Sequence, residues 1–382
     1  MYRILFVGIP LMGTINPQLA IAKKLIENNC TVDFINSNII KKQVNSIKAN
    51  LIPLRKFPNA KYNIYYERNL YVDAYKTALC VVKNYDLIIY DSWFFLGRKL
   101  SEISGVPCVK ISSMFAFNKN TINDLIYSSP SWYMYRFSWY RKLMTKYYCK
   151  NLKISSNDFW EEMYKDSLPL TIVFTNKTFQ PHYTEFDSNY KFVGPIISDR
   201  KYDELFIPYN TMKRPIIYVA LGTISKNKKI IETCIKTYSN KDCSVLISLG
   251  NKINKNDFKN TAENIYLYSY VPQLDVLKKC DLFVTHGGMN SVNEAMFFGV
   301  PMIVCPQFSD QFLIAKQVER LNLGITIFKS QFNESVLREK TKYILSNNKI
   351  KQSVLNNKIT FNKNDGLKES VELIQQFLRE NK

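Results

Sequence analysis

The stretch Thr285-His-Gly-Gly-Met-Asn-Ser-Val-Asn-Glu294 largely decides the fold of this chain. It begins at the end of an apolar run, Leu282–Thr285, which is typical of a buried strand. A helical pattern over Ser291–Phe298 follows the two glycines. In open sheets of parallel strands, ligands bind beyond the carboxyl ends of the strands. Glycine lets a phosphate approach the backbone, and a helix N-terminus favours anions. The stretch therefore predicts a turn that can hold a diphosphate.

The rest of the second half repeats this strand–turn–helix pattern. Apolar runs end at small or polar residues, and helical patterns separate several of them. Such alternation predicts a parallel sheet with helices on its faces. The expected strands are Pro215–Leu221, which ends at Gly222-Thr223, Ser244–Leu249, which ends at Gly250, then Pro301–Cys305 and Ile325–Ile327; the expected helix before the last is Asp310–Leu321.

The first half follows the same plan. Strands are expected at Ile4–Val7, Thr31–Ile35, Asp86–Tyr90 and Cys108–Ile111, with a turn over Gly8–Pro17 and helices at Gln18–Asn28 and Phe94–Ile103. The predicted class is α/β, with two Rossmann-like, doubly wound parallel-sheet domains facing a cleft. The first domain is expected over residues 1–205 and the second over 206–365, with a turn-rich linker near 192–208. A helix within residues 366–382 is expected to cross back to the first domain.

Composition limits the function classes. The 382 residues carry a net charge of +20, but the lysines are scattered and no nucleic-acid-binding motif is present. The eight cysteines form no CxxC pair, as expected for reduced thiols in the cytoplasm. The N-terminus lacks the pattern of a signal peptide, and no apolar stretch is long enough to cross a membrane.

The segment Ser131–Tyr148 is unusually aromatic and basic. The favoured interpretation is an ordinary helix that covers the first sheet. The alternatives are a wall of a pocket for an apolar substrate, or a surface that makes weak contact with a membrane.

Local explanations without a ligand also exist for the opening stretch. Ser291-Val-Asn-Glu294 fits a capping box, Gly287-Gly288 fits a simple turn, and Asp310 fits a helix cap. Each explains its own residues, but none explains why they cluster.

The combined pattern resembles the donor signature of the UDP-glycosyltransferase superfamily, glycosyltransferase family 1, and within it the bacterial macrolide glycosyltransferase branch. The matching segments of the second half are Tyr270-Val-Pro-Gln273, His286-Gly-Gly-Met-Asn-Ser291, Glu294, Gly299-Val-Pro301 and Asp310-Gln311. The first half agrees at Gly13-Thr-Ile-Asn-Pro17, Tyr90-Asp91, Gly105-Val-Pro107 and Phe192-Val-Gly-Pro195. The resemblance covers roughly residues 3–330 and implies the GT-B fold.

The resemblance also implies roles on the donor side. Tyr270, with Val271 beside it, would stack on the base where the family usually has Trp, and Gln273 would contact the base or ribose. Glu294 would bind the ribose hydroxyls. The diphosphate would lie on Thr223, His286, Gly287, Gly288, Asn290 and Ser291. Asp310 and Gln311 would bind the sugar. The chain has no Asp-x-Asp sequence, so a metal-bridged diphosphate is not indicated, and no cofactor is expected beyond the UDP- or dTDP-sugar substrate.

One position departs from the family. The histidine that usually activates the acceptor hydroxyl is Thr14 here, although its aspartate partner is present as Asp91. Threonine is no base near neutral pH. Three explanations stay open: Asp91 acts as the base with a raised pKa, the acceptor needs little activation, or transfer activity has been lost. The only other histidine, His182, matches no motif and is interpreted as a surface residue.

The predicted function is metal-independent, inverting transfer of a hexose to a small-molecule acceptor. One rival is a silent partner that stabilises another enzyme, motivated by Thr14. The other is a peripheral glycosyltransferase of membrane lipids, motivated by the basic charge and Ser131–Tyr148.

Overall fold

The computed structural model describes residues 1–61, 67–149, 158–165, 168–197, 205–222, 227–250, 252–259, 261–361 and 365–381. The chain divides into two compact units. Unit 1 comprises Met1–Ile126, Trp132–Ser198 and Asn364–Lys382, and unit 2 comprises Tyr127–Ser131 and Asp199–Lys363. Within the described ranges, no helix is long and apolar enough to cross a membrane.

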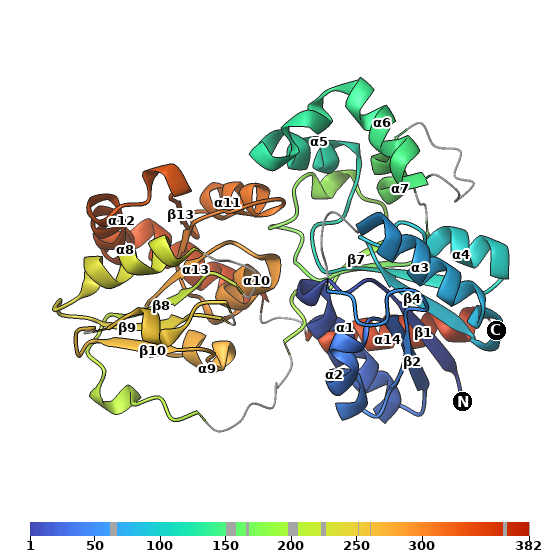
Figure 1. Ribbon diagram of the computed structural model, residues 1–382, viewed down its shortest axis with the longest axis horizontal. Coiled ribbons are helices and arrows are strands. Elements are labelled where there is room, and N and C mark those ends of the chain that lie inside the picture. Colours follow the sequence, from blue (N-terminus) through green and yellow to red (C-terminus); the bar gives the residue numbers. More distant parts are fainter. Residues whose placement is uncertain are drawn as a thin grey trace. The chain divides into compact units, whose positions relative to one another are not determined.

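Unit 1 is built on a sheet of parallel strands in the order β3-β2-β1-β4-β5-β6-β7 (Figure 1). The strands are β1 (Arg3–Val7), β2 (Thr31–Asn36), β3 (Asn50–Pro53), β4 (Leu87–Asp91), β5 (Cys108–Ser112), β6 (Thr171–Val173) and β7 (Tyr190–Phe192). β1 lies between β2 and β4, with Val7 paired to both Ile35 and Tyr90. The strand order thus reverses between β1 and β4, and in such sheets ligands bind beyond the carboxyl ends of the strands at this point.

Helices cover both faces of this sheet. The pair α1 (Met12–Glu27) and α14 (Gly366–Glu380) packs on one face, and α3 (Glu67–Leu79) and α4 (Gly97–Ser104) pack together on the other (Figure 1). α2 (Lys41–Ser46) lies beside β3. The buried side chains of α14, including Val371, Ile374 and Phe377, belong to the same apolar core as β1 and α1. The C-terminal helix is therefore part of unit 1.

Unit 2 has a second parallel sheet in the order β10-β9-β8-β11-β12-β13. Its strands are β8 (Ile216–Ala220), β9 (Ser244–Ser248), β10 (Ile265–Tyr268), β11 (Leu282–Thr285), β12 (Met302–Val304) and β13 (Gly324–Thr326). Every residue of β8 and β11 is buried, as expected for central parallel strands. This topology confirms the predicted fold class of two doubly wound sheets.

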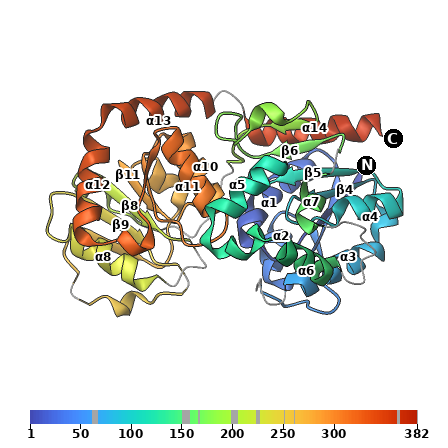
Figure 2. The ribbon, with the colours of Figure 1, turned by 90° about the horizontal axis from the view of Figure 1, so that it is seen from above.

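The helices of unit 2 are α8 (Lys228–Tyr238), α9 (Gln273–Leu277), α10 (Met289–Phe298), α11 (Gln311–Arg320), α12 (Glu334–Ser346) and α13 (Asn348–Phe361). α8 packs on α12, and α10 packs on α13 (Figure 2). α10 also packs on α9. Two of these helices begin at the predicted ligand turns: α10 follows β11, and α11 follows β12.

The structure corrects the start of the first helix. The sequence predicted a turn over Gly8–Pro17, but α1 begins at Met12 and contains Pro17. Proline removes one helical hydrogen bond. Ile15 and Ile21 are buried on either side of it in the core of unit 1, and their packing offsets that loss. The predicted helix at Phe94–Ile103 is α4, which begins later, at Gly97, and ends at Ser104.

The interpretation of Ser131–Tyr148 as an ordinary helix over the sheet is wrong. The segment forms a 3-10 helix, η3 (Pro130–Arg136), with a kink at Trp132, followed by α6 (Ser138–Cys149). α6 packs on the short helix α7 (Phe159–Tyr164), near α5 (Lys119–Ser128) (Figure 1). Several large apolar side chains of this segment are exposed.

Gly366 offers a test of the packing of α14. A Cβ placed there would lie 2.8 Å from the carbonyl oxygen of Val193 and 2.9 Å from that of Pro195. Gly366→Ala must therefore displace the start of α14, and we expect a loss of about 1–3 kcal/mol in the free energy of unfolding, measured by chemical denaturation. The exposed Lys368→Ala on the same helix should change stability by less than about 0.5 kcal/mol. Equal stability of the two variants would contradict this packing.

Candidate active site

His286 occupies a space that two glycines leave open. It directly follows β11, and its ring lies against Gly222 and Gly288. A Cβ at Gly288 would lie 2.6 Å from the Nε2 atom of His286, and one at Gly222 would lie 2.9 Å from it. Gly222 also has a φ of +78°, in the left-handed region. Gly287, with a φ of +85°, brings the turn close to Val304, where a Cβ would lie 2.6 Å from Cγ1.

Burial makes the His286 ring neutral. It lowers the pKa of His286 to about 4, and the backbone of Ala220 acts weakly in the opposite direction. At pH 7 the imidazole is therefore uncharged and carries one N–H donor. Its buried Nδ1 atom has no hydrogen-bond partner among the described residues. A diphosphate bound beside the ring would raise the pKa of His286, and the protonated ring would have a second N–H to donate to the anion.

The start of α10 lies directly after His286. Gly288 is the N-cap residue and supplies no side-chain cap, so the first N–H groups of the helix are not capped from within the segment. Asn290 and Ser291 lie in this first turn. The capping-box interpretation of Ser291 and Glu294 is wrong, because the helix starts before Ser291 and Glu294 binds a residue of another helix. The N–H groups of a helix start and the helix dipole favour an anion here.

A partly buried polar network joins α9 to α10. The Nε2 atom of Gln273 donates to Glu294 Oε2 at 2.6 Å and contacts Ser291 Oγ at 3.2 Å. Tyr218 donates its hydroxyl to Gln273 Oε1 at 3.2 Å. Glu294 is buried, so its carboxylate is held in a single orientation by Gln273. Gln273, Ser291 and Glu294, three residues of the predicted donor set, are thus linked by hydrogen bonds.

Tyr270 and Val271 lie in the loop before α9. The Tyr270 side chain is 47% exposed, whereas Val271 is buried and anchors the loop. A ring on an anchored loop at the edge of a polar network can stack on a planar group.

Asp310 and Gln311 have different environments. Gln311 is buried, and its Oε1 atom accepts from the backbone N–H of Gln307 at 2.8 Å and of Phe308 at 3.3 Å. It therefore fixes the loop before α11. Asp310 stands at the N-cap position but makes no side-chain cap bond, so the helix-cap interpretation is wrong. Burial raises the pKa of Asp310 to about 6, and hydrogen bonds from its own backbone and from Ser309 lower it in part.

Thr223, the remaining predicted donor contact, lies outside the described residues; its neighbour Gly222 is described.

In unit 1, Asp91 ends β4 and is buried among hydrogen-bond donors. It accepts from Ser113 Oγ at 2.6 Å, from the Ser113 N–H at 3.3 Å and from the Trp93 N–H at 3.1 Å. Burial raises the pKa of Asp91 to about 6, although all three hydrogen bonds act to lower it. Sequence reasoning missed Ser113 as the partner; the only signal was the polar pair Ser112-Ser113 at the end of β5.

Thr14 lies in the first turn of α1, which follows β1, the neighbour of β4. Its hydroxyl donates to the Leu11 carbonyl at 2.9 Å. No hydrogen bond joins Thr14 to Asp91 within the described part of the chain. The two residues therefore stand at the same edge of the sheet, but they do not form a base–orienter pair.

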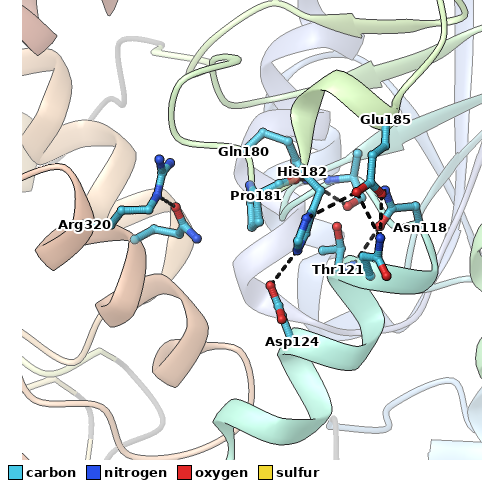
Figure 3. Close-up of polar contacts among 11 residues, drawn as sticks. Asn118, Thr121, Asp124, Gln180, Pro181, His182, Glu185 and Arg320 are labelled. Atoms are coloured by element: carbon cyan, nitrogen blue, oxygen red, sulfur yellow. Dashed lines mark hydrogen bonds and ion pairs between the residues drawn. The ribbon is translucent and has the colours of Figure 1, made fainter.

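His182 is held between two carboxylates (Figure 3). Its Nε2 atom lies 2.8 Å from Asp124 Oδ2, and its Nδ1 atom lies 3.4 Å from Glu185 Oε1. Glu185 also accepts from Asn118 and Asn120. Both ring nitrogens of His182 face acidic partners, so this histidine belongs to an exposed polar network of unit 1.

Across the described ranges, no three side chains of His, Cys, Asp or Glu group closely enough to hold a metal ion.

The chain is similar to glycosyltransferases over its whole length. The family described as erythromycin biosynthesis protein CIII-like, C-terminal domain, matches residues 232–359. An uncharacterized UDP-glucosyltransferase, YojK of Bacillus subtilis, is 28% identical over 91% of this chain and 90% of its own. The oleandomycin glycosyltransferase of Streptomyces antibioticus is 26% identical over 66% of this chain and 59% of its own. The crystal structure of the calicheamicin glycosyltransferase CalG4 superposes with a TM-score of 0.81 at 20% identity, covering 99% of this chain and 98% of its own.

The environment of His286 can be tested by NMR titration, because the chain has only two histidines. We expect His286 to titrate near pH 4. Gly288→Ala should force the ring out of its buried position and raise this pKa towards about 6.5, the value of exposed histidine. Gly13→Ala, where a Cβ meets nothing within 4 Å, is the control and should leave the titration unchanged. A His286 titration near 6.5 in the unaltered protein would contradict the described burial.

Proposed function

Since the chain is a glycosyltransferase of the macrolide and UDP-glycosyltransferase type with the GT-B fold, we propose that it transfers a hexose from a UDP- or dTDP-sugar to the hydroxyl of a small apolar acceptor. Transfer inverts the configuration at C1 and needs no metal ion. Unit 2 binds the donor, and Asp91 of unit 1 is the base.

The observation that carries the proposal is the arrangement around α10. His286 and the uncapped helix start offer donors to a diphosphate, while Glu294, held by Gln273, offers a carboxylate to ribose hydroxyls. Tyr270 offers a ring to the base of the nucleotide. Asp310 lies at the next strand end, where it can accept from a sugar hydroxyl. These four contacts together suit a nucleotide-sugar better than a simple anion.

The proposed chemistry assigns the proton to Asp91. The acceptor oxygen attacks C1 of the sugar, the bond from C1 to the diphosphate oxygen breaks, and the hydroxyl proton passes to the Asp91 carboxylate. A base works best when its pKa lies near the working pH. The raised pKa of Asp91 meets this requirement without a histidine at position 14. His286 donates a hydrogen bond to the departing diphosphate, whose negative charge raises the pKa of the ring.

The surroundings of Asp91 favour an apolar, planar acceptor. The partly exposed ring of Trp93, two residues beyond Asp91, lies 5.9 Å from the Phe117 ring and 6.4 Å from the Trp132 ring. Trp132 in turn lies 5.3 Å from Trp160. Such aromatic walls bind apolar ligands through large contact areas. An acceptor library rich in phenols and macrocyclic alcohols is therefore the first to screen.

Donor binding can be measured by calorimetry with UDP and dTDP. We expect one of them to bind, and we expect His286→Ala and Glu294→Ala each to weaken binding about tenfold or more, because each removes a hydrogen bond to a charged or polar group of the ligand. Glu334→Gln, on α12, is the control and should bind as the unaltered protein does. The proposed donor site fails if neither nucleotide binds, or if all variants bind equally.

The proposed base predicts the pH dependence of transfer. A base must be deprotonated, so kcat/KM should be constant above the pKa of Asp91, about 6, and fall about tenfold per pH unit below it. Asp91→Asn should lower kcat by about a hundredfold or more. Ser113→Ala removes a hydrogen bond that lowers this pKa, so it should move the acid limb to higher pH. Unchanged transfer by Asp91→Asn would exclude Asp91 as the base.

A further inference from the structure

The outer face of α6 carries an apolar stripe. Residues 139, 143 and 147 are spaced four apart, so their side chains lie on one side of the helix. Trp139 is 57% exposed, Leu143 is 54% exposed and Tyr147 is 44% exposed. An amphipathic helix normally turns such a stripe towards the core. This stripe faces solvent.

Packing of the opposite face fixes this orientation. Thr145 and Tyr148 are buried against α7, where the Tyr148 ring stacks on Phe159 with centroids 4.9 Å apart. The Thr145 hydroxyl accepts from the Phe159 N–H at 2.9 Å. A rotation of α6 that buried Trp139 would break both contacts. The exposed stripe is therefore a stable feature of unit 1.

Aromatic side chains of η3 extend the stripe. The Phe137 ring lies 6.5 Å from Trp139, and the Tyr133 ring lies 5.6 Å from Phe137. Phe137 and Tyr133 are also exposed. The Arg136 guanidinium lies 5.1 Å from the centre of the Tyr133 ring. The exposed apolar area is thus continuous from Tyr133 to Tyr147.

Lysines border this area. Lys142 and Lys146 are exposed on the same side of α6, and neither has an ion-pair partner among the described residues. The sequence from 131 to 149 contains no acidic residue. Asp158, the residue before α7, forms an ion pair with Arg141 at 3.5 Å, on the side of α6 that packs against α7. The outer side therefore combines exposed aromatic rings with unpaired positive charge.

We propose that this α6 surface, formed by Tyr133, Phe137, Trp139, Leu143, Tyr147, Lys142 and Lys146, docks on the surface of an anionic phospholipid bilayer. Aromatic rings favour the headgroup region of a bilayer, and lysines beside them attract anionic headgroups. A second copy of the chain is a poorer occupant, because its own lysines would repel these. This role is independent of the proposed function: it concerns where the protein lies, whatever its donor or acceptor.

Flotation with unilamellar vesicles tests the proposal. The full-length protein is mixed with vesicles of phosphatidylcholine alone, or of equal parts phosphatidylcholine and phosphatidylglycerol, at about 0.1 M and about 0.5 M salt. We expect binding only to the anionic vesicles, weakened at high salt. Trp139→Ser/Leu143→Ser should weaken it about tenfold or more. Lys142→Gln/Lys146→Gln should weaken it about fivefold per lysine.

The matched control lies on α13. Leu355 and Ile359 are also exposed, spaced four apart and near lysines, but α13 itself carries no exposed aromatic side chain among its described residues. Leu355→Ser/Ile359→Ser should bind vesicles as the unaltered protein does. Three outcomes would overturn the proposal: no binding to anionic vesicles, equal binding by all variants, which would assign it to the net charge of +20, or a dimer in size-exclusion chromatography that only the α6 variants abolish.

Discussion

The candidate site of unit 2 depends on the space that Gly222 and Gly288 leave around the imidazole ring of His286. Each added Cβ would lie within 3 Å of that ring. Because the ring fits so closely, burial lowers its pKa and keeps it uncharged. Before any anion binds, the uncharged ring offers little electrostatic attraction, so oriented backbone N–H groups would have to supply it in the proposed diphosphate site. The uncapped start of α10 supplies these directly beside the ring.

Burial shifts the pKa of acidic groups in the direction opposite to that of histidine, because it disfavours the charged form of each. Burial raises the pKa of Asp91 and of Asp310 to about 6. For Asp91, the effect outweighs three hydrogen bonds that favour the carboxylate. Desolvation therefore brings an ordinary aspartate towards the pKa that a general base needs. The proposed role of Asp91 as the base depends on this shift, since Thr14 cannot take that role.

Much of the fold could be predicted because parallel strands are short, apolar and bounded by glycine or proline. Leu282–Thr285 matches β11, and Thr31–Ile35 falls within β2. The weaker predictions failed where tertiary contacts override local pattern. Pro17 indicated a turn, but α1 continues through it, because side chains on both sides of the proline pack in the core of unit 1. Ser291 and Glu294 indicated a capping box, but Gln273 takes the carboxylate.

By itself, the sequence determined the alternation of strands and helices and the glycine turn at His286, and it carried the resemblance that assigns residues to a nucleotide-sugar donor. These features are local, because strand periodicity and left-handed glycines leave a direct mark on residue order. Only the tertiary structure decided which partners these residues meet and how burial shifts their pKa values. Gln273 meets Glu294, Ser113 meets Asp91, and α6 turns its aromatic stripe outward, because packing brings together residues that no sequence spacing connects.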